Sequence, residues 1–176
     1  MTLIWGFLPW IGYAVVSAVG WQWGAAAGLL AALVAVVRDR RAVSVLDVGT
    51  LVFFAALTVL AFAVPDSPVQ QHDGSLSSLW LALIAWVSIA AGRPFTEGIA
   101  RRRVPPAMWD DPRFKRLNLV ITRVWASAFT VVAVVGFVAE ASHAGLAVNV
   151  VIRVLGFAAP MWFTHRHVAR VRAGVR

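Results

Sequence analysis

The sequence predicts an all-α polytopic transmembrane helix bundle with six spans. Its 176 residues are 60% hydrophobic, whereas soluble domains are about 45–50% apolar. The apolar residues form runs long enough to cross a bilayer core of about 30 Å as helices, and these runs lack the polar face of a soluble helix. We therefore expect one transmembrane domain over residues 1–176, with a cytoplasmic loop at 92–118 and a basic tail at 165–176.

Residues 3–37 are predicted to form two short spans, at 3–19 and 21–37. A single helix of this length would measure about 50 Å, which is far longer than the bilayer core. The segment Gly20–Gly24 places a Gln between two Trp, and this composition suits a turn at the membrane interface. Since the N-terminus has no basic region and no suitable cleavage site, we expect a retained helix and not a signal peptide.

Gly20, Gly24 and Gly28 recur at every fourth position around the start of the second span. Small residues at this spacing let another helix approach closely. We favour packing within the chain over a homodimer contact, and the oligomeric state stays open.

Four further spans are predicted from the remaining apolar runs. They lie at 43–64, 76–91, 119–139 and 145–164. The loops at 38–41 and 92–118 and the C-terminal tail carry Arg, whereas the loops at 65–75 and 140–144 carry neither Arg nor Lys. Because basic loops stay on the cytoplasmic side, six spans place both termini in the cytoplasm. A five-span alternative would move the N-terminus outside.

Arg153 is the most unusual residue of the predicted spans, because it lies eight residues into the last one, after Asn149. A charge at this depth costs at least about 2.5–3.5 kcal/mol on insertion scales. We expect Arg153 to face the bundle interior or a hydrated cavity. We favour pairing with Asp47 or Glu140, or with helix carbonyls; the alternative is a site for an anionic lipid or ion.

Asp47 is the one acid inside a predicted span, and Arg123 lies at a similar depth on the fifth span. A pair between Asp47 and Arg123 would relieve the burial of both charges. A proton-relay role for Asp47 is the alternative. Glu140 is expected at the level of the lipid headgroups.

No catalytic, metal or cofactor motif is recognised in the chain. It has no Cys, its four His lie in loops or the tail, and the usual nucleophile, phosphate and dinucleotide fingerprints are missing. We therefore expect no enzyme activity, no metal and no cofactor. The net charge of +8, with fifteen Arg among sixteen basic residues, is explained by basic cytoplasmic loops that contact anionic headgroups, and not by nucleic-acid binding.

The loop at 92–118 has a specific layout. Gly92 and Pro94 end one helix and force an extended exit, while Asp111 and Pro112 are an N-cap and first-turn pair that opens the next. The residues expected to contact lipid headgroups are Arg93, Arg101, Arg102, Arg103, Lys115 and Arg116.

This layout resembles the intracellular septation protein A family of small inner-membrane proteins. The matching residues are Gly92-Arg93-Pro94, Trp109, Leu117-Asn118, Trp125 and Phe129. It also resembles actinobacterial membrane proteins of unassigned function. The resemblance implies a bacterial inner-membrane protein that acts in envelope synthesis or division through lipids and partner membrane proteins, and it implies no catalytic residue. The alternative function is a small transporter or channel with a polar path near Arg153, Asn149 and Asp47; a lipid-binding or lipid-modifying role is a third possibility.

Overall fold

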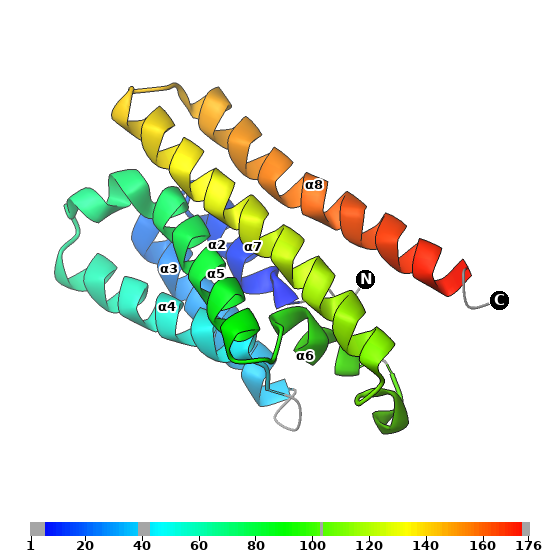
Figure 1. The fold of residues 1–176 in the computed structure, drawn as a ribbon. Coiled ribbons are helices and arrows are strands. Elements are labelled where there is room, and N and C mark those ends of the chain that lie inside the picture. The colour runs from blue at the N-terminus through cyan, green and yellow to red at the C-terminus, as the bar shows by residue number, and fades with distance from the viewer. Residues whose placement is uncertain (1–5, 39–42, 103, 174–176) are drawn as a thin grey trace. The chain divides into compact units, whose positions relative to one another are not determined.

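The structure is a computed structural model that describes residues 6–38, 43–102 and 104–173. Within these ranges the chain folds into helices and turns, without strands (Figure 1). The helices belong to two compact units, one formed by residues 1–70 and 98–103 and the other by residues 71–97 and 104–176. Each unit is described by itself.

Five helices are long and apolar enough to cross a membrane, which confirms the predicted class of multi-pass helical membrane protein. They are α3 (Trp21–Arg38), α4 (Val45–Ala63), α5 (Asp73–Ala90) with the 3-10 turn η2 (Pro68–His72) before it, α7 (Pro112–Ala141) and α8 (Leu146–Ala173).

The predicted first span is replaced by the short helix α2 (Leu8–Val16). Pro9 lies in its first turn and so begins the helix instead of kinking it. At the other end the Ser17 hydroxyl donates to the Tyr13 carbonyl at 2.6 Å, and α2 stops there. Nine residues reach only about 14 Å. The break between α2 and α3 was predicted correctly, but the described part of the chain does not contain a sixth helix of spanning length.

In the first unit, two of the three stripe glycines face a neighbouring helix. A Cβ on Gly24 would overlap Ser17 at the end of α2, and a Cβ on Gly28 would lie 2.5 Å from the Phe54 ring of α4. Both glycines thus allow close packing within the chain. Gly20 precedes α3, and its surroundings would admit a Cβ without a clash.

Two tryptophans join α2 to α4, and α3 to the turn after α4, by hydrogen bonds. The Trp10 indole donates to the Thr50 hydroxyl at 3.1 Å, and the Trp21 indole donates to the Pro65 carbonyl at 3.0 Å. Each buried indole N–H therefore has an acceptor, as apolar surroundings require.

In the second unit, α5 and α7 run antiparallel. Near one end of the pair the Ser75 hydroxyl donates to Glu140 at 2.8 Å, and further along the Trp86 indole donates to the Thr130 hydroxyl at 3.1 Å. The contacts of α5 with α7 therefore pair rising residue numbers on α5 with falling numbers on α7, as expected for antiparallel helices (Figure 1).

Helix α8 packs antiparallel on α7 (Figure 1). The Trp125 indole donates to the Thr164 hydroxyl at 3.1 Å, and a Cβ on Gly156 would overlap Val132. The helix continues without interruption from the predicted sixth span into the basic tail. Most of its apolar side chains are exposed, as expected for a helix that faces lipid.

The end of α5 confirms the predicted Gly92 exit. Gly92 has a φ of +68°, its N–H donates to the Ile89 carbonyl at 3.0 Å, and the Arg93 N–H donates to the Ser88 carbonyl at 2.9 Å. This is a Schellman C-cap, whose left-handed position favours glycine.

The chain then forms α6 (Phe95–Arg101) and the 3-10 turn η3 (Pro106–Met108) before α7 begins. Asp111 is the N-cap of α7, where its carboxylate accepts the Arg113 N–H at 2.7 Å and Pro112 occupies the first turn. The predicted start of this helix is confirmed.

Candidate functional site

Arg153 lies between two carboxylates at one end of the second unit. Its Nη2 atom is 3.8 Å from Asp73 Oδ1 and 3.7 Å from Glu140 Oε1. Its Cα lies about 10 Å along α8 from the start of that helix, but the side chain points back toward the helix N-terminus. The guanidinium therefore reaches the first residues of α5, where a Cβ on Gly74 would overlap it.

Glu140 is the most buried ionisable group of this end, with its side chain 8% exposed. One carboxylate oxygen accepts the Ser75 hydroxyl at 2.8 Å, and the other lies 2.9 Å from His72 Nδ1. Glu140 belongs to the last turn of α7, where the helix dipole disfavours a negative charge. The neighbouring donors and Arg153 offset this effect, since a buried carboxylate is stable only when it is paired.

Together these residues form the Glu140 cluster, defined as His72, Asp73, Ser75, Glu140 and Arg153. The cluster links η2 and the start of α5 with the end of α7 and the first part of α8. Ser75 is buried, and its hydroxyl donates a hydrogen bond to the Glu140 carboxylate. This arrangement joins the beginning of α5 to the end of α7 and the first part of α8.

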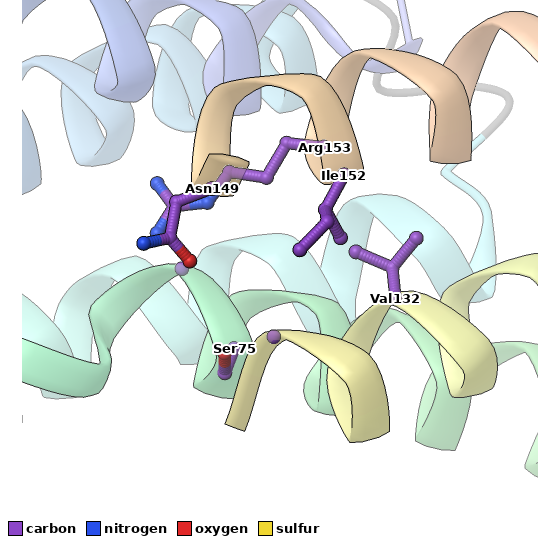
Figure 2. A pocket seen from close by; sticks show the side chains of 7 residues that line it. Ser75, Val132, Asn149, Ile152 and Arg153 are labelled. Carbon is purple, nitrogen blue, oxygen red and sulfur yellow. The ribbon is translucent and has the colours of Figure 1, made fainter. Parts of the chain in front are cut away.

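A shallow pocket adjoins Arg153 at the seam of the three helices (Figure 2). Its lining includes Ser75, Val132, Asn149 and Ile152 together with the arginine, and it has no space for a water molecule. Asn149 turns its amide toward its own helix start and donates to the Ala144 carbonyl at 3.2 Å. The packing here is tight, in contrast to a hydrated path.

Asp47 has a local structural role in the first unit. Its Oδ2 atom accepts from the Ser44 backbone N–H and hydroxyl at 2.8 Å each, and Arg102 Nη2 lies 2.6 Å away. With Ser44 as N-cap, this is a capping box at the start of α4. The expected Asp47–Arg123 pair is thus replaced by Asp47–Arg102, and Arg123 is exposed on α7.

The expected headgroup contacts differ in exposure. Arg93, Lys115 and Arg116 are exposed, and Lys115 makes a 2.8 Å ion pair with Asp110. The Arg101 and Arg102 side chains are partly buried, and Arg102 pairs with Asp47. Arg103 lies outside the described residues.

Sequence reasoning missed Asp73 as a partner of Arg153, and it missed His72 and Ser75 as partners of Glu140. These residues lie in and just after a loop whose composition predicted a turn but no contact with another helix. It also missed the Ser44 capping box, although Ser44-Val45-Leu46-Asp47 before an apolar run is its recognisable pattern. The signal for the Glu140 cluster was weaker, because its two acids and three other polar residues are spread over facing helix ends.

Neither a protein-family model, nor a curated protein, nor a solved structure matches this chain.

Proposed function

We propose that the chain is a non-enzymatic protein of the bacterial plasma membrane, and that it acts in the cell envelope or in division through contacts with lipids and other membrane proteins. The supporting observation is that two charged residues within the predicted spans pair with groups of opposite charge. Arg153 and Glu140 meet at the Glu140 cluster, and Asp47 meets Arg102 within the first unit. Arg153 and Asp47, two charges within predicted spans, thus each have a local partner, as a scaffold of packed helices requires.

The exposed basic residues Arg93, Lys115 and Arg116 support the lipid part of the proposal. They flank the loop between α5 and α7 and suit anionic headgroups on the cytoplasmic face. The opposite loops, at 65–75 and 140–144, carry no Arg or Lys, which favours an orientation with the basic loop inside.

A deletion strain tests the proposal directly. Loss of the gene is expected to change cell length, septum placement or sensitivity to envelope stress, and the intact chain should restore the normal state. Normal values of all three in the deletion strain would contradict the proposal.

Neutral substitutions at Arg93, Lys115 and Arg116 test the role of the basic loop. The triple Gln variant should restore the deletion strain poorly at equal membrane abundance and unchanged orientation. A matched control replaces the exposed residues Asp66, Gln70 and Gln71 with Asn, Ala and Ala and should restore it fully. Equal restoration by both variants would refute the role of this loop.

A further inference from the structure

We infer that Arg153 and Asp73 form a subsite for the headgroup of a zwitterionic phospholipid, with the phosphate on the guanidinium and an ammonium on the carboxylate. The inference deepens the lipid contacts of the proposed function and rests on it. Phosphatidylethanolamine has the required chemistry.

The first observation is the unmet hydrogen-bonding capacity of Arg153. Its ion-pair distances to Asp73 and Glu140 are 3.8 and 3.7 Å, which is too long for hydrogen bonds. Among the residues that the structure describes, none accepts a hydrogen bond from this guanidinium, whose five N–H groups are all donors. The side chain is also 46% exposed. Arginine presents its donors in a fork that fits phosphate oxygens.

The second observation is the setting of the exposed guanidinium. The exposed α8 side chains around it are apolar and include Val150, Val151 and Val154. The guanidinium itself lies beside Gly74 at the beginning of α5, and we place the lipid headgroups at this end of the helix. A phosphate at this level reaches the arginine from the lipid side, while the glycerol and chains continue along the apolar face of α8.

The third observation is the net charge of the Glu140 cluster, which favours one class of lipid headgroup over another. One guanidinium faces the two carboxylates of Asp73 and Glu140. With His72 neutral the cluster carries a net charge of −1, and this repels a purely anionic headgroup. A zwitterionic headgroup avoids that repulsion, because its ammonium lies against a carboxylate. Asp73 is the more exposed of the two acids and is the partner we assign to the ammonium.

The test uses the full chain reconstituted in vesicles of equal parts phosphatidylethanolamine and phosphatidylglycerol. The protein is then extracted in mild detergent, and the retained lipids are measured by mass spectrometry. The natural chain should retain phosphatidylethanolamine over phosphatidylglycerol by about fivefold or more, since a charge-assisted hydrogen bond from the ammonium to Asp73 contributes roughly a tenfold affinity and phosphatidylglycerol has no ammonium. Retention in the bulk ratio would overturn the inference.

Two substitutions sharpen the result. Arg153→Ala should return the retained ratio to that of the bulk membrane. Arg170→Ala is the matched control, because Arg170 is exposed on the same helix about 25 Å away and should leave the ratio unchanged. Undiminished enrichment in Arg153→Ala, or an equal loss in Arg170→Ala, would contradict the subsite.

Asp73→Asn provides a second variant that keeps the side-chain size. It removes the ammonium partner and brings the cluster to neutrality, so the retained fraction of phosphatidylglycerol should rise. If Arg153→Ala does not fold, Asp73→Asn alone tests the subsite. An unchanged lipid preference in Asp73→Asn overturns the inference.

Inorganic phosphate distinguishes a lipid from a free anion. Millimolar phosphate should not raise the unfolding temperature of the delipidated protein, whereas added phosphatidylethanolamine should raise it. An equal rise with both would mean a general anion site and would refute the lipid assignment. The lipid measurements do not depend on the phenotype of the deletion strain. The retained lipids test the headgroup subsite, and the phenotype tests the proposed function.

Discussion

Glu140→Gln is expected to weaken the packing of α5 on α7. The substitution keeps the side-chain size and removes the negative charge. The amide oxygen still accepts the Ser75 hydroxyl, now 2.8 Å from the carboxylate. What is lost is the charge assistance of the 2.9 Å contact with His72 and the attraction of Arg153 at 3.7 Å.

The magnitude follows from burial. Hydrogen bonds to a charged group contribute about 1.5–3 kcal/mol. However, the side chains of His72 and Arg153 are 42% and 46% exposed. Solvent therefore screens their interactions with Glu140, and each contribution falls toward the value of a surface ion pair, about 0–1 kcal/mol. We therefore expect a net loss of about 1–2 kcal/mol in the free energy of unfolding, a factor of roughly 5–30 in the folded population ratio.

The assay is equilibrium unfolding in mixed micelles, followed by circular dichroism. Asp110→Asn is the matched control. Asp110 also makes a 2.8 Å ion pair, with Lys115, but its side chain is 92% exposed, so its loss should change the free energy by less than about 0.5 kcal/mol. Equal effects of the two substitutions would refute the reasoning from burial.

Three further substitutions test particular contacts in the same assay. His143→Gly should stabilise the protein by about 0.5–1 kcal/mol, because His143 ends α7 with a φ of +53°, a conformation that glycine adopts without strain; a lower stability would contradict this. Ser44→Ala should cost about 1 kcal/mol through loss of the α4 cap, and an unchanged unfolding midpoint would show that the cap is dispensable. Gly136→Ala should cost about 1–3 kcal/mol, since its Cβ would lie 2.5 Å from the Ser75 hydroxyl, whereas Gly12→Ala, with no atom in the way, should be neutral or mildly stabilising.

Helix ends were the most predictable part of the fold, because their determinants are local. Gly92 at the end of α5 and the Asp111 and Pro112 pair at the start of α7 act through the backbone of the next few residues. Such signals need no knowledge of tertiary structure. The length of α2 was less predictable, because the apolar composition of the sequence continues past Val16, where the helix ends.

The partners of buried charges were only partly predictable. Glu140 was one of two acids offered for Arg153, although it was expected at the level of the lipid headgroups. Asp73 was missed because the contact depends on how far the arginine side chain bends toward the helix end and on Gly74, which has no side chain in the place that the guanidinium occupies. Asp47 was assigned to Arg123 from depth alone, while the path of the chain after α6 brings Arg102 to it.

The exposed apolar surface of α8 explains why amphipathicity gave little information about packing. In water, the buried face of a helix is read from its apolar stripe. In α8 both the lipid-facing and the protein-facing sides are apolar, and the contact with α7 depends on shape. Gly156 opposite Val132 and the Trp125 bond to Thr164 mark that contact, and neither is recognisable from hydropathy.

The most direct test of the central claim, that Arg153 is held by an intramolecular charge partner, is a double-mutant cycle. Glu140→Gln, Arg153→Gln and the double variant are compared by their free energies of unfolding. We predict a coupling energy of about 1 kcal/mol, in the range measured for groups in contact. Additive effects, with a coupling below about 0.3 kcal/mol, would contradict the account and return Arg153 to the alternative of a charge that lines a polar path.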